Sequence, residues 1–135
     1  MPWQFNRTEA VFVQIARRLR REILGGKYPK GEQFPPVRQL AAQAAVNPNT
    51  VQKALALLEQ EGLLCAHGTA GRFVSTSEEV LTLARERICN EIIRDLLKEM
   101  NALGVTKAEL LKYIEEEHNY DGSPHFDVQE SDEKL

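Results

Sequence analysis

The sequence contains little cysteine, few aromatic residues and no long apolar run. Only Cys65 and Cys89 occur among its 135 residues, which is too few for the disulfide framework of a small secreted domain. No stretch approaches the roughly 18 consecutive apolar residues that a transmembrane helix needs. The N-terminal segment, residues 1–7, lacks the apolar core of a signal peptide. These absences predict a cytoplasmic protein with no membrane partner.

The residues of an enzyme active site are also missing. The sequence has no glycine-rich phosphate loop, no nucleophile motif and no paired acid and base residues, so we expect neither catalysis nor a cofactor. We expect Cys65, on a short apolar segment, and Cys89, near an apolar helix stripe, to be core residues rather than reactive thiols.

A metal site near the C-terminus is an alternative function. His118, Asp121, His125 and Asp127 lie close together there, and imidazole and carboxylate groups both ligate divalent ions. The segment has no thiol and no fixed helical spacing, so we predict no metal site.

The charge is distributed unevenly along the chain. Residues 1–75 carry a net charge of +5 and residues 76–135 a net charge of −8. A basic half joined to an acidic half suggests that the first half meets a polyanion. The alternative is two solvated surfaces of opposite sign.

Three helices are predicted in the basic half. The first covers residues 9–24, with Thr8 as its N-cap and apolar residues on one face. The second begins at Pro35 and the third at Asn47, which suits an N-cap position. Because only a tight turn, residues 45–47, separates the second helix from the third, the pair is typical of a helix-turn-helix.

A β-hairpin is predicted after the third helix. Two short apolar segments, residues 63–66 and 72–75, flank a glycine-bearing loop at 67–71. Residues 27–32, before the second helix, form a turn by composition. A helix, a helix-turn-helix and a hairpin follow one another in the order of a winged helix.

Two further helices are predicted in the acidic half, over residues 77–103 and 107–118. Thr76 with Glu79, and Thr106 with Glu109, have the spacing of capping boxes. The longer helix carries more apolar surface than one small domain needs. We therefore expect it to pair with a second copy of the chain, through Ile88, Ile92, Leu96, Met100 and Leu103.

The predicted fold class is thus mainly α with a small β-hairpin. We expect a winged helix-turn-helix DNA-binding domain at residues 1–75, a two-helix dimerisation segment at 76–118 and an acidic tail at 119–135.

The outward face of the third helix is the predicted base-reading surface. The second helix of a helix-turn-helix lies in the major groove, where amide side chains bond adenine and lysine donates to guanine. A winged helix that binds only protein would instead present apolar or acidic residues. The alternative for Asn49 and Thr50 is helix capping. The candidate residues are Asn49, Thr50, Gln52 and Lys53.

Other candidate contacts flank this helix. Arg38, at the start of the second helix, is placed to hold a phosphate together with the helix N-terminus. On the wing, Gly68 permits close approach of the backbone to the duplex, and His67 and Arg72 are polar candidates beside it. The alternatives are a solvated arginine and ordinary hairpin residues.

Many residues between about 9 and 75 stand in an order that resembles a known family. They include Phe34-Pro35-Pro36-Val37-Arg38-Gln39-Leu40-Ala41, Val46-Asn47-Pro48-Asn49-Thr50-Val51, Glu61-Gly62-Leu63 and Gly71-Arg72-Phe73-Val74. This pattern resembles the GntR family of bacterial transcription regulators. The stretch from Val46 to Ala54, the early Trp3 and Phe5, and the short two-helix C-terminus resemble its YtrA subfamily.

The resemblance implies a homodimeric repressor bound to an inverted-repeat operator in double-stranded DNA, often of its own operon and of neighbouring ABC-transporter genes. It places the phosphate-holding arginine on Arg38. The family's usual serine before the second helix is Pro36 here, so that cap is absent. A small-molecule effector stays open as a further partner. The resemblance places recognition-helix and wing contacts on Asn49, Thr50, Gln52, Lys53, His67 and Gly68.

Overall fold

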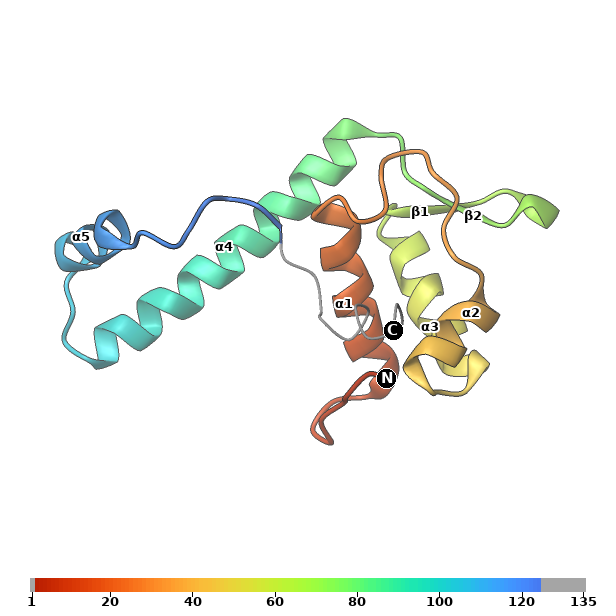
Figure 1. Cartoon of the computed structure of the whole chain (residues 1–135), viewed down its shortest axis with the longest axis horizontal. Coiled ribbons are helices and arrows are strands. Elements are labelled where there is room, and N and C mark those ends of the chain that lie inside the picture. The colour runs from red at the N-terminus through yellow and green to blue at the C-terminus, as the bar shows by residue number, and fades with distance from the viewer. Residues whose placement is uncertain (1, 125–135) are drawn as a thin grey trace. The chain divides into compact units, whose positions relative to one another are not determined.

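The computed structural model describes residues 2–124 of the chain (Figure 1). Their fold is mostly helical with one two-stranded antiparallel hairpin, as predicted. The described residues form two compact units, one up to Leu81 and one from Thr82 to Pro124. The elements are α1 (Val11–Leu24), α2 (Val37–Ala44), α3 (Pro48–Gln60), β1 (Leu64–Ala66), the 3-10 turn η1 (Gly68–Ala70), β2 (Arg72–Val74), α4 (Glu78–Ala102) and α5 (Lys107–Glu116).

Helix α1 is an amphipathic helix that begins two residues later than predicted. Ile15, Leu19 and Ile23 are buried on its inner face. The prediction of Thr8 as N-cap is wrong, because the cap position is Ala10 and makes no side-chain hydrogen bond. The side chain of Asn6 instead accepts hydrogen bonds from the backbone of Thr8 and Glu9 at 3.0 and 3.3 Å, and this turn occupies the start of the predicted helix.

Helices α2 and α3 form the helix-turn-helix. Ala45 ends α2 in the left-handed conformation with φ 58°, and Asn47 caps α3 by accepting a hydrogen bond from the Asn49 amide at 2.7 Å. Figure 1 shows α1, α2 and α3 grouped together, and α3 contacts both of the other helices. Leu40 and Leu55 are fully buried in the core that these helices share.

The hairpin after α3 is the wing. Strands β1 and β2 pair with Cys65 opposite Phe73. Residues 31–34, predicted as a turn up to residue 32, add a third extended segment: the Phe34 amide donates to the Arg72 carbonyl at 2.8 Å, and the Val74 amide to the Glu32 carbonyl at 2.9 Å. The wing is therefore held along both edges of β2.

The expectation that Cys65 and Cys89 are core residues is wrong, since both are exposed. Side chains alternate between the two faces of a strand. Leu64 takes the buried face, so Cys65 faces outward.

Helix α4 begins with a cap different from the predicted one. The Ser77 hydroxyl accepts a hydrogen bond from the Val80 amide at 3.2 Å, so Ser77, rather than the predicted pair of Thr76 and Glu79, caps the first turn. The capping box of α5 is confirmed: Thr106 accepts from the Glu109 amide at 3.1 Å and its own amide donates to the Glu109 side chain at 3.0 Å.

The second unit buries very little of its apolar surface. Leu110 of α5 is its one buried apolar residue among those that the structure describes. Exposed large apolar side chains run along both helices and the turn that follows α4: Leu83, Ile92, Ile93, Leu97, Leu103, Leu111, Tyr113 and Ile114.

No helix within residues 2–124 is long and apolar enough to cross a membrane. The predicted acidic tail, residues 119–135, lies outside the described residues from position 125 onward.

Candidate nucleic-acid interface

The outward side of α3 carries the predicted base-reading residues. Asn49, Gln52 and Lys53 are exposed, and Thr50 is half-buried in the first turn. Because Asn47 supplies the cap and Pro48 takes the first helical position, the side chain of Asn49 is not needed to begin the helix. The α3 face therefore offers amide and ammonium groups to a partner.

The N-terminus of α2 lies close to that of α3. A hollow of about 600 Å³ is lined by Pro36, Val37, Arg38 and Pro48, so the first turns of both helices border it. The N-cap of α2 is Pro36, which makes no side-chain hydrogen bond to the first turn. The amides of that turn are donors without an intrahelical partner, and helix N-termini favour anions. Arg38, exposed in the same turn, adds a full positive charge.

Ion pairing decides which cations of the first unit are available to a partner. Arg17 pairs with Glu9, Arg18 with Glu22 at 3.4 Å and Arg20 with Glu61 at 2.6 Å, and a further pair joins Arg72 to Glu59. The bond from Arg17 holds the pKa of Glu9 below its ordinary value. Within residues 2–124, neither Arg38 nor Lys53 forms an ion pair with a carboxylate. Those two charges, like those of Arg7 and Arg21, therefore remain for a polyanion.

Lys53 is oriented by its neighbour on α1. Its ammonium lies 5.9 Å from the centroid of the Phe12 ring, within the range of a cation–π contact. Phe12 is half-buried. The contact holds the Lys53 side chain beside Phe12, and the residue as a whole stays exposed.

At the wing tip, the exposed side chain of His67 stands next to Gly68, which has no side chain. His67 meets the edge of Phe73 with ring centroids 4.9 Å apart, and its amide donates to the Gly71 carbonyl at 2.8 Å. Gly68 has φ +57°, and a Cβ there would meet no atom within 4 Å. Gln33 supports the tip by donating to the Ala70 carbonyl at 2.8 Å. The tip is thus open to a large partner.

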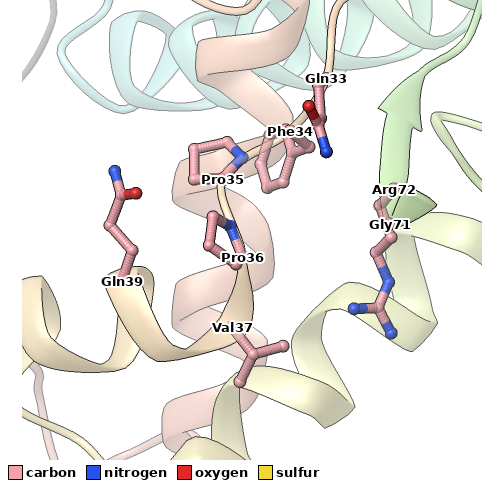
Figure 2. Close-up of a pocket in the computed structure, with 8 residues that line it drawn as sticks. All are labelled: Gln33, Phe34, Pro35, Pro36, Val37, Gln39, Gly71 and Arg72. Atoms are coloured by element: carbon pink, nitrogen blue, oxygen red, sulfur yellow. The ribbon is translucent and has the colours of Figure 1, made fainter. Parts of the chain in front are cut away.

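Arg72 turns toward α3 rather than toward the tip of the wing. Its guanidinium donates to the Glu59 carboxylate through Nε and to Gln52 Oε1 at 2.9 Å. Figure 2 shows Arg72 leaving β2 on one wall of a groove of about 460 Å³. The groove lies between β2 and the start of α2; its other lining residues are Gln33, Phe34, Pro35, Pro36, Val37, Gln39 and Gly71.

The structure therefore brings some of the predicted residues together in ways that the sequence did not indicate. Arg38 lies beside the start of α3, and Arg72 is bonded to Gln52. Two residues of this region were not predicted as functional. They are Glu59, which accepts a hydrogen bond from Arg72, and Gln33, which donates one to the wing tip. No sequence signal marks either, because both contacts depend on the position of the wing against the rest of the first unit.

The predicted dimerisation residues lie in the second unit. Ile92 and Leu103 are exposed, while Ile88, Leu96 and Met100 are half-buried.

The alternative of a metal site gains no support from the described residues, which contain no group of three or more His, Cys, Asp or Glu able to hold an ion. His118 and Asp121 are described, whereas His125 and Asp127 lie outside the described residues.

Comparison with known proteins places these features among DNA-binding regulators. Residues 12–74 match the sequence family described as bacterial regulatory proteins, gntR family. The chain is 29% identical to YhcF of Bacillus subtilis, an uncharacterised helix-turn-helix-type transcriptional regulator, over 82% of this chain and 92% of that one. It is also 29% identical to the transcriptional repressor YtrA of the same organism, over 78% of this chain and 82% of the repressor.

A solved structure shares the fold. A GntR family transcriptional regulator from Listeria monocytogenes superimposes with a TM-score of 0.77, covering 84% of this chain and all of that chain, at 24% identity. This similarity confirms the predicted winged helix-turn-helix followed by helices.

Proposed function

Because residues 12–74 are a helix-turn-helix domain of the gntR family of bacterial regulatory proteins, we propose that this chain is a homodimeric repressor of an inverted-repeat operator. It is a DNA-binding transcription regulator and not an enzyme. The proposal is carried by one observation: the exposed polar and basic side chains of α3 lie next to the uncapped start of α2, where Arg38 forms no carboxylate ion pair within residues 2–124.

In this proposal α3 enters the major groove and its exposed side chains meet base edges. Lys53 donates to guanine N7 or O6, and Asn49 and Gln52 contact bases through their amides. Thr50, half-buried near the helix start, reaches a phosphate or a thymine methyl. These contacts supply the sequence preference.

Phosphate contacts fix the position of α3 on the duplex. Arg38 and the first amides of α2 hold one phosphate, because a guanidinium and a helix N-terminus both favour an anion. His67 and Gly68 meet the backbone or the minor groove at the wing tip. Such contacts contribute affinity and register without reading sequence.

A second copy of the chain completes the second unit. Ile92 and Ile93 are about half exposed, at 49% and 51%, and Leu103 is 77% exposed. A run of apolar side chains of this kind on one helix is typical of an interaction surface. Two copies related by a two-fold axis read two half-sites of an inverted repeat, which greatly increases discrimination over one half-site. The proposed contact residues are Ile88, Ile92, Leu96, Met100 and Leu103.

Repression is proposed because one relative, YtrA of Bacillus subtilis, is a transcriptional repressor. The target genes that we propose are the chain's own operon and adjacent ABC-transporter genes, and the site of action is the cytoplasm, where the operator lies. A small-molecule effector is not needed for binding in this proposal.

The test is a selection of bound duplexes from a random DNA pool by the purified full chain, at a salt concentration of about 0.15 M. We expect an enriched inverted repeat, with affinity that falls steeply as salt rises. Bulk binding without enrichment would contradict sequence-specific recognition. Enrichment of a single half-site would contradict two-fold assembly. A winged helix used only for protein contacts would enrich nothing and show no such salt dependence.

A further inference from the structure

Three side chains connect the wing to the proposed base-reading face. Arg72 on β2 donates to two residues of α3, Glu59 through Nε and Gln52 through its terminal nitrogen at 2.9 Å. Gln52 and Glu59 are seven residues apart, so they lie two turns apart on the same side of α3. The arginine therefore links the wing to both ends of this face.

The bond from Arg72 determines which way the Gln52 amide faces. A guanidinium only donates hydrogen bonds, so the amide must turn its oxygen, and not its NH₂ group, toward Arg72. Among residues 2–124, Gln52 Nε2 has no hydrogen-bond acceptor. Gln52 is exposed. The amide thus presents its two N–H donors to a partner, while its oxygen faces Arg72 and has one of its two lone pairs occupied.

This orientation changes the base that Gln52 suits. An unrestrained glutamine pairs with adenine by accepting from N6 and donating to N7. An adenine amino group that approached the oxygen of Gln52 would compete with a positively charged donor. Guanine presents only acceptors, N7 and O6, in the major groove, and these match the NH₂ group.

We propose that Arg72 and Glu59 are positioning residues that fix Gln52 as a donor, so that Gln52 reads guanine rather than adenine in each half-site. The inference rests on the proposed function, because it requires α3 to lie in the major groove. The role of Glu59 is to hold Arg72 on α3. Arg72 is 24% and Glu59 29% exposed, so the pair is partly shielded from water and keeps its geometry.

The experiment compares full-length wild type with Gln52→Ala and Arg72→Ala in the same random-pool selection. We expect wild type to enrich a guanine whose preference disappears in Gln52→Ala, which identifies the position that Gln52 reads. In Arg72→Ala we expect the guanine-to-adenine ratio at that position to fall roughly ten-fold, because Gln52 can then rotate to pair with adenine. The ratio, measured on two duplexes that differ by that base pair, is the readout. A general loss of affinity would not change it.

Glu59 of α3 and Glu61, the C-cap residue of that helix, provide a matched pair of variants. Glu59→Gln and Glu61→Gln each remove one negative charge near the end of the helix, but Glu59 holds Arg72 whereas Glu61 accepts from Arg20 at 2.7 Å. We expect Glu59→Gln to shift the ratio in the same direction as Arg72→Ala, and Glu61→Gln to leave it unchanged. Glu59→Gln, with Glu61→Gln as its control, keeps the proposal testable if Arg72→Ala folds poorly.

The failures of the two proposals are distinguishable. If wild type enriches no sequence, the proposed function fails and this inference fails with it. If wild type enriches an inverted repeat but the position read by Gln52 is adenine, or no position depends on Gln52, only the inference is overturned. An unchanged guanine-to-adenine ratio in both Arg72→Ala and Glu59→Gln overturns it as well.

Discussion

The two units of the chain differ in how much apolar surface each buries on its own. All buried apolar residues of the described chain except Leu110 belong to the unit that ends at Leu81. That unit has a core between three helices and a hairpin, in which Leu55 and Leu58 are fully buried. The unit from Thr82 to Pro124 leaves most of its large apolar side chains exposed.

The difference suggests that the two units have different functions. Contacts with base edges need side chains held on a rigid scaffold, and the first unit provides one. The second unit lacks a core of its own, so its exposed apolar face is best explained by a partner that completes it. Under the proposed function, the first unit reads DNA and the second sets how two copies are spaced.

The largest expected effect comes from a charge placed among the proposed dimer contacts of the second unit. Leu96→Asp would bury an unpaired carboxylate in each copy of the proposed dimer, at a cost of about 3–5 kcal/mol per charge. We expect the variant to be monomeric at micromolar concentration in sedimentation experiments, and its operator binding to weaken accordingly. If this variant stayed dimeric, the apolar residues of the second unit around Leu96 would not be the dimer contact.

Lys98→Asp is the matched control for this charge. It introduces the same carboxylate on the same helix, and Lys98 is exposed. At 100° per residue, position 98 lies about 160° around the helix from Leu96, away from the exposed apolar side chains. We expect Lys98→Asp to remain dimeric, which would separate the effect of the face from that of the charge.

The second prediction compares core removal in the two units. Leu58 is 0% exposed and Leu103 is 77% exposed. In the monomeric Leu96→Asp background, we expect Leu58→Ala to lower the free energy of unfolding by about 2–5 kcal/mol. Leu103→Ala should change it by less than about 0.5 kcal/mol. Urea unfolding followed by circular dichroism measures both. Similar losses would mean that the second unit has a core of its own.

The third prediction separates two kinds of DNA contact within the first unit. We expect Lys53→Ala to weaken operator binding by about 1–3 kcal/mol per half-site while hardly changing binding to unrelated DNA. Arg38→Ala should weaken binding to all sequences alike and reduce the salt slope by about one. Titrations of operator and random duplexes at several salt concentrations distinguish them. Unchanged operator affinity in Lys53→Ala would contradict its assignment to a base, and neither variant should change the oligomeric state.

The elements of the fold that were predicted correctly have strong local signals. Asn47 followed by Pro48 begins α3, and Gly62, with φ +81°, follows its end. The capping box at Thr106 and Glu109 begins α5. Each signal acts over a few residues, so no knowledge of tertiary structure was needed. The resemblance to the GntR family is confirmed by the match over residues 12–74.

The incorrect predictions arose where two neighbouring residues offered the same interaction. Thr8 and Asn6 were both available to turn the chain before α1, and Asn6 accepts the backbone hydrogen bonds. Thr76 and Ser77 were both available to cap α4, and Ser77 takes that role. A continuous apolar segment such as residues 63–66 does not reveal which side chains face inward, and for this reason the exposure of Cys65 was missed.

The candidate site could be predicted as a set of residues but not as a network. Composition and order along the chain pointed to Gln52 and Arg72 separately. Their hydrogen bond, and the role of Glu59 in holding Arg72, depend on the register of the hairpin and its position against α3. These are long-range features that a single sequence does not encode in any local pattern.

The smallest effect that we predict concerns two carboxylates, one in each unit. Burial raises the pKa of Glu22 above its ordinary value of 4.5, despite Lys27 at 3.5 Å and Arg18 at 3.4 Å. The hydrogen bond with the Thr106 backbone lowers the pKa of Glu109. A raised acid pKa means that the folded state favours the protonated form. The stability that protonated Glu22 contributes is therefore present below its unfolded pKa and is lost as pH rises through the folded pKa.

The two units should consequently respond to pH with opposite signs. Glu22→Gln removes the ionisation, so its free energy of unfolding should rise relative to wild type between pH 4 and pH 7. Ionised Glu109 stabilises α5 above its unfolded pKa, and that contribution is lost as pH falls, so Glu109→Gln should lose stability relative to wild type over the same rise in pH. Thermal unfolding of both variants at several pH values measures the two slopes. Slopes of the same sign would show that burial does not dominate the ionisation of Glu22, and that its two cations compensate fully for the loss of water.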